Sequence, residues 1–499
     1  IYLNAQVRRI GVSHLKAAPK KGPDLGTENI LMVGSTSRCA LKVQNALYGL
    51  CSQGVTGINS DVIMILHLDP AHRSVAVLSI PRDLFVPNAR ATGANKIDAA
   101  LVEGPSQLVA AIEEDFGIPI QHYVELNFDT FASVVDALGG VNMYFPEPVY
   151  DAYSHLNIQT TGCLHLDGFQ ALEVVRARHL QYKGPGVTST DPAYWPQETE
   201  SDLARIRRDH EFLRVLASAV AARGLGNPMT DARIVSSIAP DLTVDSAFGT
   251  SHMVNEILSY HGINPFNAPE VTVPVMVSEV DEYLYKGGAY GNVEFPIDPQ
   301  DSQVIDGFLG ASHSTNTLTG DPLPNPASVS VSILDGSGDY SDGQTAASGL
   351  KALGFNVTGV SETSMVGEQA ETVVEYSADT PTEEAAAQAV ASSLSGQVVM
   401  ALEPAAGSGA QVTVVTGTNF SVNPPAPPPS TTTTTHLEKT QTLRSQKKHR
   451  STPTTTQPVP STTTTTVPQV AGFGPPSAAV QSLAPWDPRS CTATGGPGP

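Results

Sequence analysis

Apolar residues are spaced with two different periods between residues 29 and 310. Short apolar runs predict strands at 29–34, 62–68, 75–80, 123–128 and 141–145. Apolar residues that recur every three or four positions predict helices at 106–116 and 130–138, and a longer one from Thr199, Ser201 and Asp202, which are N-cap residue types, to about Ala222. Strands and helices that alternate along a chain indicate a layered α/β domain.

The amino-acid composition distinguishes four further segments of the chain. Residues 1–28 are a basic, Gly- and Pro-containing lead-in, and a Ser/Thr/Asn/Pro-rich linker at 311–327 follows the first domain at 29–310. A second, small α/β domain is predicted over 328–422, with helices near 344–353 and 382–394. From 423 to 499 Pro and Thr dominate, with two runs of five threonines. Such a segment cannot bury a core, so it is predicted to be a disordered tail.

The charge of the chain is strongly acidic and unevenly distributed. The 499 residues carry a formal net charge of −21. The segment from Pro424 onward holds six Lys/Arg and two acids and is therefore +4, which leaves −25 for the remainder. So acidic a body argues against nucleic acid as a ligand, because binding a phosphate backbone needs a broad positive surface. It leaves room for one local basic pocket.

Arginines gather at a few points of this acidic chain, close to carboxylates. The clusters are Asp61 with Arg82-Asp83 at the ends of two apolar strands, then Arg176 and Arg178, then Asp202, Arg205 and Arg208. Planar guanidinium groups bind phosphate oxygens in a bidentate manner. If these side chains converge, they form a site for a phosphorylated anion.

Each arginine also has an ordinary structural interpretation. Arg82 can pin the strand ends through an acid beside it, and the later pairs can be exposed on a strand and on a helix flank. One anion site accounts for all of them together. On a helical wheel Arg205 and Arg208 share a flank and are predicted to face a cleft, whereas Arg207 is predicted to point to solvent.

Other phosphate and nucleophile chemistries lack their motifs here. The sequence contains no G-x-x-x-x-G-K-[ST] loop and no G-x-S-x-G elbow. The histidines show no triad pattern, so they are interpreted as structural: His67, His122, His165 and His179.

Several motif segments occur together and in order between residues 29 and 220. They are Asn29–Arg38, Ser60–Met64, Leu78–Asp83, Asn95–Ala100, His122–Val124, Asp136–Val141, His165–Leu172, Arg176–His179 and Asp202–Arg208. In these segments the chain resembles the LytR-CpsA-Psr family. Its second domain resembles the C-terminal domain that accompanies this family in actinobacteria.

The resemblance implies an α-β-α domain with a central mixed sheet and a membrane-anchored, extracytoplasmic phosphotransferase. Such an enzyme moves a glycopolymer from a polyprenyl diphosphate carrier to peptidoglycan through a phosphodiester link, with the carrier lipid in an apolar tunnel. The implied catalytic residues are Asp61, as base or metal ligand, and Arg82. The implied diphosphate ligands are Arg82, Arg176, Arg178, Arg205 and Arg208, with Arg38 a further candidate.

The resemblance also implies Mg²⁺, and here the chain departs from the family. Thr36 stands where the family usually has a metal-binding Asp, and a hydroxyl is a weak Mg²⁺ ligand. Asn59 replaces an arginine and Asp209 replaces a glutamine. Either Asp61 holds the metal with waters and substrate phosphates, or this member has altered or lost activity.

The chain has four cysteines, Cys39, Cys51, Cys163 and Cys491, in no zinc-binding spacing. The spacing of Cys39 and Cys51 fits a disulfide loop and two unrelated core residues equally well. The oxidising compartment that the resemblance implies favours the disulfide. No apolar run reaches the roughly 20 residues that span a membrane, so the implied anchor is expected ahead of Ile1.

Two other functions stay open at this point. The same site would serve a pyrophosphatase that cleaves polyprenyl diphosphates with water as the acceptor. The third hypothesis is a non-catalytic protein that binds the lipid carrier or the cell wall. Thr36 and Asn59 favour this hypothesis.

Overall fold

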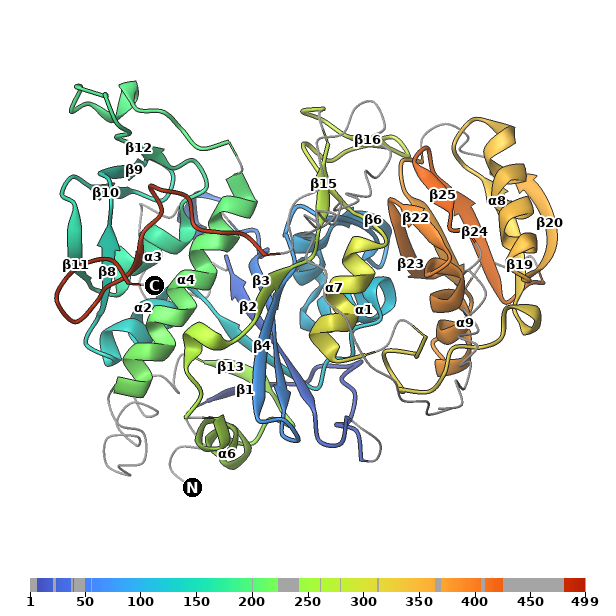
Figure 1. Ribbon diagram of the computed structural model, residues 1–499, viewed down its shortest axis with the longest axis horizontal. Coiled ribbons are helices and arrows are strands. Elements are labelled where there is room, and N and C mark those ends of the chain that lie inside the picture. The colour runs from blue at the N-terminus through green and yellow to red at the C-terminus, as the bar shows by residue number, and fades with distance from the viewer. Residues whose placement is uncertain are drawn as a thin grey trace, which may run out of the picture.

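The computed structural model describes residues 7–20, 24–36, 39, 50–54, 56–199, 201–222, 242–260, 262–278, 280–311, 314–363, 369–404, 409–424 and 480–498. These residues form two α/β domains side by side, and a C-terminal segment returns to the first domain (Figure 1).

A seven-stranded sheet runs through the first domain. In spatial order its strands are β1 (Arg8–Ile10), β13 (Thr243–Asp245), β7 (His122–Leu126), β2 (Glu28–Ser35), β3 (Ser60–Asp69), β4 (Ser74–Ser79) and β14 (Glu270–Thr272). The pairs β1/β13, β7/β2 and β4/β14 are parallel and the others are antiparallel, so the predicted mixed sheet is confirmed. The predicted lead-in is not separate from the domain, because Arg8–Ile10 is a strand of this sheet.

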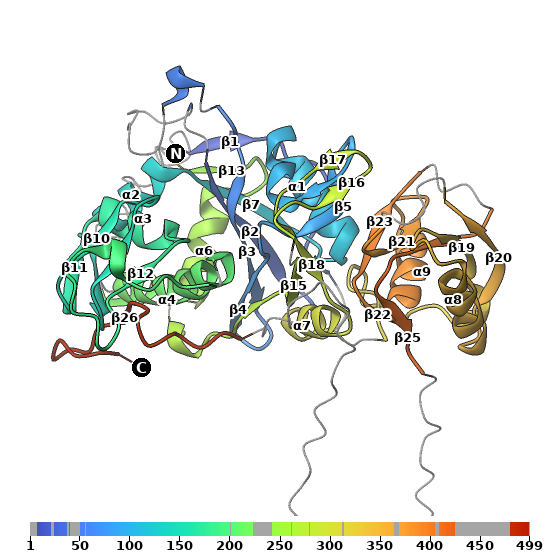
Figure 2. The ribbon, with the colours of Figure 1, turned by 90° about the horizontal axis from the view of Figure 1, so that it is seen from above.

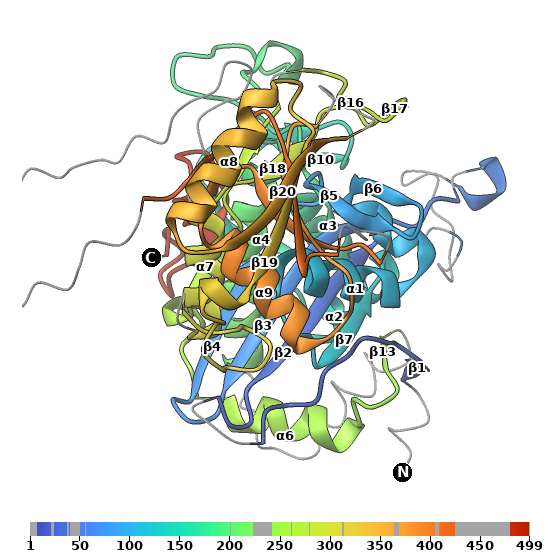
Figure 3. The same cartoon turned by 90° about the vertical axis from the view of Figure 1, so that its right-hand side faces the viewer.

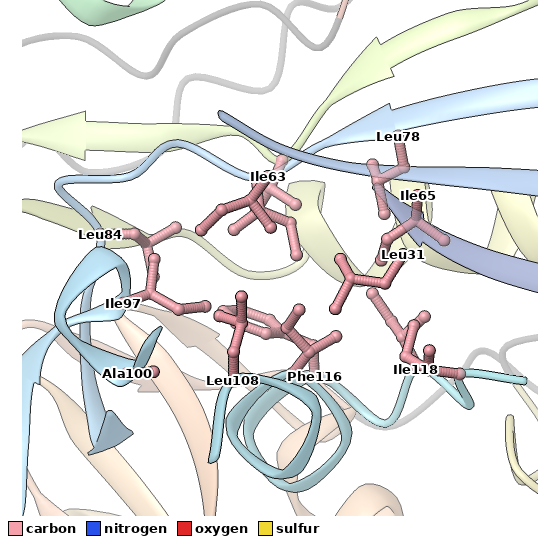
Figure 4. Close-up of a cluster of buried hydrophobic side chains, with 14 of the residues drawn as sticks. Leu31, Ile63, Ile65, Leu78, Leu84, Ile97, Ala100, Leu108, Phe116 and Ile118 are labelled. Carbon is pink, nitrogen blue, oxygen red and sulfur yellow. The ribbon is translucent and has the colours of Figure 1, made fainter. Parts of the chain in front are cut away.

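Alternating side chains of the central strands serve the two faces of the sheet. Leu31 on β2 and Ile63 and Ile65 on β3 pack on α1 (Pro105–Phe116), with the 3-10 turn η4 (Ile97–Glu103) and α7 (Gln300–Leu309) beside it (Figure 4). Their neighbours Met32 and Met64 face the opposite side.

On that opposite side lie three helices (Figure 2). They are α2 (Phe128–Ala137), α3 (Gly168–Arg176) and α4 (Ser201–Ala222). Two of them begin at residues whose side chains accept main-chain N–H groups: Asn127 caps α2, and Asp167 forms a capping box with Gln170 at α3. The domain therefore has three layers, helix, sheet and helix.

Shorter strands build small sheets around these layers. They are β5 (Phe85–Arg90) with β6 (Gly93–Lys96), β9 (Val149–Asp151) with β10 (Leu156–Ile158) and β12 (Gln181–Tyr182), β8 (Val141–Phe145) with β11 (Gly162–Leu166), β15 (Val275–Val277) with β18 (Glu294–Pro296), and β16 (Leu284–Tyr285) with β17 (Gly288–Ala289). One further helix, α6 (Thr250–Tyr260), follows β13.

The second domain is a five-stranded mixed sheet with two helices (Figure 3). Its strands, in spatial order, are β20 (Asn356–Glu362), β19 (Ser330–Asp335), β24 (Val412–Thr416), β21 (Thr372–Tyr376) and β23 (Val398–Leu402), and its helices are α8 (Tyr340–Ala352) and α9 (Pro381–Ala391). A small pair, β22 (Leu394–Gly396) and β25 (Phe420–Val422), completes it. The small α/β domain predicted from sequence is confirmed. It contacts the first domain where the main chains of Asp298 and Gly396 exchange two hydrogen bonds, of 2.9 and 3.0 Å.

Residues 480–498, here called the C-terminal strap, lie against the first domain, and the red ribbon in Figure 1 follows them past α4 to β8. Within the strap, β26 (Arg489–Ser490) pairs antiparallel with β8, and Cys491 forms a disulfide with Cys163. Trp486 stacks on Tyr182 with ring centroids 3.8 Å apart. The prediction of disorder is therefore wrong for 480–498, while 425–479 lies outside the described residues.

The strap also brings a carboxylate to two buried arginines of α4. Asp487 is fully buried, with its Oδ2 2.6 Å from Arg207 Nε and its Oδ1 3.2 Å from Arg208 Nη1. Both oxygens of Glu198 lie 2.7 Å from Arg208, whose exposure is 0%. The prediction that Arg207 points to solvent is wrong, and so is the prediction that Arg208 faces the cleft. A helical wheel assumes that one face is solvated, and the strap covers that face.

Asp487→Asn tests this buried network. Removing one partner leaves a buried charge without compensation, which typically costs about 3–5 kcal/mol, so the free energy of unfolding should fall by that order. Both tryptophans of the chain, Trp195 and Trp486, are in the first domain or its strap, so tryptophan fluorescence during denaturant unfolding reports on this region.

The matched control is Asp281→Asn, which changes an exposed acid in the same way. Equal unfolding midpoints for the two variants would contradict a structural role of Asp487.

A candidate anion-binding site at the mouth of an apolar cavity

A cavity of about 330 Å³ lies between the sheet and helices α2, α3 and α4. Its volume is at the lower end of small-molecule pockets. Most of its wall is apolar, and the residues that form this part are Met32, Val33, Val62, Met64, Leu126, Phe128, Phe131, Val134, Val135, Leu172, Val175, Phe212 and Leu216. The remaining wall is polar and includes Asp61, Arg176, Arg178, Arg205 and Asp209. The cavity is therefore amphiphilic, with charge gathered in one part.

Three guanidinium groups meet at one buried carboxylate beside this polar wall. Asp202, at the first turn of α4, has its Oδ1 2.9 Å from Arg205, 3.3 Å from Arg178 and 4.0 Å from Arg82. The Asp202 side chain is only 2% exposed. These arginines come from α4, from the segment after α3 and from the turn after β4. The structure thus brings together three of the predicted anion ligands.

Asp61 lies within the same cluster, at the second position of β3. Its carboxylate forms an ion pair with Arg82, and its main-chain carbonyl accepts from Arg205 Nη2 at 2.5 Å. The side chains of Asp61 and Arg82 are 23% and 21% exposed. Asp61 lines the cavity, whereas Arg82 is not one of its lining residues and lies next to it through the ion pair with Asp61.

Asp83 holds the cluster from the other side. Its oxygens lie 2.6 Å from Arg178 Nη2 and 2.9 Å from Lys96 Nζ. Burial alone would raise the pKa of Asp83, but Arg178, Arg82 and Lys96 together lower it to about 2. Asp83 therefore stays ionised and fixes the positions of the cations. The sequence motif marks Asp83 as a salt-bridge partner of Arg82 but gives no sign of the contact with Lys96.

Arg176, the last residue of α3, joins the cavity from a different direction. Its guanidinium carbon lies 4.6 Å from the centre of the Phe128 ring, a cation–π contact. This places Arg176 where the apolar wall meets the polar one.

The remaining predicted site residues are placed elsewhere. Arg208 is buried in the strap network and does not line the cavity. Arg38 lies outside the described residues. Cys39 and Cys51 form the predicted disulfide, with Cα atoms 5.0 Å apart, which confirms that pairing. The second disulfide, Cys163–Cys491, was missed, although two cysteines left over in an oxidising compartment are a signal for it.

The donor groups at the cluster do not fit a dedicated Mg²⁺ site. Mg²⁺ requires oxygen ligands in near-octahedral geometry. The Thr36 hydroxyl is buried and already bound to the main chain of Asn59, at 3.0 Å from its nitrogen and 3.3 Å from its oxygen. The Asp61 carboxylate is shared with Arg82. Among the described residues, the one group of three side chains close enough to share an ion lies elsewhere.

Two buried carboxyl groups flank the arginines with raised pKa values. Burial raises the pKa of Asp209 to about 7, although Arg205 and Arg208 oppose the shift. Burial also raises the pKa of Asp98 to about 6, where Arg82 opposes the shift and the neighbouring Asp83 adds to it. Asp209 lines the cavity 3.6 Å from Arg205 Nε. It is therefore a group at the site that exchanges a proton near neutral pH, and sequence reasoning noted it only as a departure from glutamine.

Two known sequence families match this chain, one in each domain. A sequence profile described as "LytR_cpsA_psr family" matches residues 12–290, and one described as "LytR cell envelope-related transcriptional attenuator" matches residues 328–420. The "Probable cell wall biosynthesis protein LcpB" of Corynebacterium glutamicum is 35% identical over 237 residues, which are 47% of this chain and 52% of that protein. The chain thus spans about half the length of that relative.

One further relative and one solved structure are also similar to this chain. The "Polyisoprenyl-teichoic acid--peptidoglycan teichoic acid transferase TagU" of Bacillus anthracis is 30% identical over 252 residues, 50% of this chain and 74% of that protein. Among solved structures, the "LytR-Csp2A-Psr enzyme from Actinomyces oris" has 22% sequence identity and a TM-score of 0.46, covering 61% of this chain and 96% of that one.

Asp209→Asn should change how stability depends on pH. The unfolded carboxyl loses its proton near pH 3.9, whereas the folded one keeps it to about pH 7. In that window the folded protein binds more protons, so the free energy of unfolding falls as the pH rises, and it levels off above about pH 7. Asparagine does not ionise. Relative to the wild type, the variant should therefore gain stability between about pH 4 and about pH 7 in denaturant unfolding. Parallel curves for the two proteins would contradict the raised pKa.

Proposed function

Given that the chain belongs to the LytR-CpsA-Psr family, we propose that it is a phosphotransferase that moves a glycopolymer from a polyprenyl diphosphate carrier to peptidoglycan. The TagU relative carries a name of this kind, a polyisoprenyl-teichoic acid–peptidoglycan transferase. The proposed product is a phosphodiester link between the two polymers.

One observation carries the proposal: an apolar cavity whose polar wall is lined by arginines held in a fixed cluster. A polyprenyl diphosphate has the matching form, a long apolar chain that ends in a compact anion. The chain would lie between the sheet and α2–α4, and the diphosphate would contact Arg82, Arg176, Arg178 and Arg205.

The ion pairs within the cluster prepare the site for this anion. Asp83 and Asp202 are buried and hold the guanidinium groups in position before a ligand arrives, and such preorganised charge stabilises a transferring phosphoryl group. Asp61 is the more exposed acid, and it competes with an incoming phosphate for Arg82. Binding of the diphosphate to Arg82 would release the Asp61 carboxylate.

The released carboxylate has a role in the proposed reaction. A sugar hydroxyl of peptidoglycan attacks the phosphorus that bears the glycopolymer, and its proton passes to Asp61. The bond from that phosphorus to the bridging oxygen breaks, and polyprenyl phosphate leaves with the bridging oxygen. The arginines neutralise the charge on the two phosphates throughout.

The proposal places the enzyme outside the cytoplasm and attached to the membrane. The two disulfides support an oxidising compartment. Among the described residues, no helix has the length and apolarity needed to cross a membrane.

The decisive experiment supplies a lipid diphosphate-linked glycopolymer with and without peptidoglycan. The proposal expects polyprenyl phosphate and a covalent glycopolymer–peptidoglycan product only when both substrates are present. Release of phosphate products at an equal rate without the acceptor would instead indicate a pyrophosphatase. Binding of the lipid without any turnover would indicate a non-catalytic carrier protein.

Arg82→Ala and Arg178→Ala should each slow this transfer by roughly 10²–10³, because each removes a preorganised contact to the transferring phosphate. Rates are compared at saturating lipid substrate. The control is Arg90→Ala, which removes the same charge from the first domain but only breaks a partly exposed pair with Glu103. An equal loss of rate in Arg90→Ala would mean that the overall field, not the cluster, supports the reaction.

Thr36→Asp should change the dependence of the reaction on Mg²⁺. In the wild type the Thr36 hydroxyl is engaged by Asn59, so chelation with EDTA should have little effect on the rate. A carboxylate at this position, where the main chain pairs with Asn59 just before β3, adds an oxygen ligand and should make transfer sensitive to EDTA and restorable by Mg²⁺. A wild type that loses its activity in EDTA would contradict this expectation.

A further inference from the structure

A second cluster of polar side chains lies at the other end of the central sheet. Glu28 is the first residue of β2, His122 is the first residue of β7, and His252 lies on α6. The anion site is at the opposite end of β2, and a strand of this length spans roughly 20 Å. The cluster is therefore separate from the proposed phosphotransfer chemistry.

The three side chains present their ligand atoms to one point. Glu28 Oε2 is 3.1 Å from His252 Nε2 and 3.8 Å from His122 Nε2, and all three ligand atoms lie within 4.8 Å of one another. Bonds of about 2.1 Å in a tetrahedral site separate two ligands by about 3.4 Å. The two distances to the carboxylate bracket this value.

A further carboxylate fixes the orientation of His122. Asp245 Oδ2 lies 3.1 Å from His122 Nδ1 and also accepts the Tyr123 N–H at 3.0 Å, while Oδ1 accepts the N–H groups of Ala247 and Phe248. With Nδ1 bound to Asp245, the ring directs Nε2 toward Glu28. Such a carboxylate–histidine pair is the arrangement that orients histidine ligands in metal sites.

Phe248 holds both imidazole rings in place. Its ring stacks on His122 with centroids 4.1 Å apart and meets the edge of His252 at 5.4 Å. The rings are therefore positioned by packing as well as by hydrogen bonds.

Glu28 supplies an independent sign that something is bound here. Its Oε2 is buried and accepts no hydrogen bond among the described residues, although it faces both histidines. A buried carboxylate oxygen left in this state is costly unless a cation compensates it.

From this geometry we propose that Glu28, His122 and His252 bind a zinc ion. Two imidazole nitrogens and one carboxylate oxygen form a ligand set that zinc favours, and hard ions such as Mg²⁺ favour oxygen ligands alone. All four cysteines of the chain are in disulfides, so no thiol competes for the ion.

A fourth ligand is available on α6. Glu256 Oε1 lies 3.5 Å from His252 Nε2, one helical turn further along. Glu256 is not in the group whose ligand atoms all lie within 4.8 Å of one another, so its side chain would have to turn toward the ion to become the fourth ligand. An ion held by Glu28, His122 and His252 would tie α6 to the starts of β2 and β7.

The test is titration of the metal-free full chain with ZnCl₂ against a chromophoric chelator. The proposal expects saturable binding of one equivalent and a higher melting temperature with zinc. His252→Ala, on the surface helix, should abolish both effects. His72→Ala is the matched control, because His72 also pairs with a carboxylate, Asp69, but belongs to no three-ligand group within the described part of the chain.

Two further variants separate a zinc site from a purely internal ion-pair network. Glu28→Gln should remove zinc binding while the chain still folds, and Asp245→Asn should weaken it roughly 10–100-fold through the orientation of His122. Co²⁺ in place of zinc should give the absorption spectrum of a tetrahedral ion.

Two outcomes would overturn the proposal. One is the absence of one-equivalent binding in the wild type. The other is unchanged binding in both His252→Ala and Glu28→Gln, which would place the ion on other histidines such as His436 and His449.

Discussion

The contact of one buried carboxylate, Asp202, with three guanidinium groups is the constraint on which the candidate site depends. Arginines gathered in a small volume repel one another, and a buried charge needs a partner of opposite sign. Asp202 and Asp83 satisfy both requirements before any ligand is present. This explains how several arginines are held together in one place in a protein of net charge −21. The acids surround the arginines and leave the side chains of Arg82 and Asp61 partly exposed.

Asp202 and Arg205 belong to helix α4, and the side chains in the first half of this helix are buried. One flank reaches the cluster through Asp202 and Arg205, and the other is covered by the C-terminal strap. Arg207 and Arg208 are neutralised there by Asp487 and Glu198. The disulfide Cys163–Cys491 joins the strap to β11, beside β8. The strap thus holds in place helix α4, which carries Asp202. The strap lies more than 250 residues further along the chain than this helix.

Two candidate sites with different chemistry lie at opposite ends of the central sheet. At the end of β2 near Ser35, arginines and the apolar cavity suit an amphiphilic diphosphate. At the start of the same strand, Glu28 and two histidines suit a transition-metal ion. A mixed sheet packed between helices is stiff, so each set of side chains is held by the backbone and not by the ligand. The two sites share strands β2 and β7 but no residues.

The sequence by itself determined the layers and the two domains. Periods of two and of about 3.6 residues reflect burial of one face of each element, so the core strands and helices appeared within a few residues of their observed bounds. It also indicated Asp61, Arg82, Arg178 and Arg205, because their motifs are local. Tertiary structure alone decided the roles of Asp202, Lys96 and Asp209, which depend on neighbours from other elements. It also decided the orientation of Arg207 and Arg208, since a helical wheel contains no information about a distant segment. The strap could not be predicted from composition, because its contacts act across hundreds of residues and Pro/Thr content describes only the local chain. These contacts are a disulfide, a strand pairing, a stacked ring and a buried carboxylate.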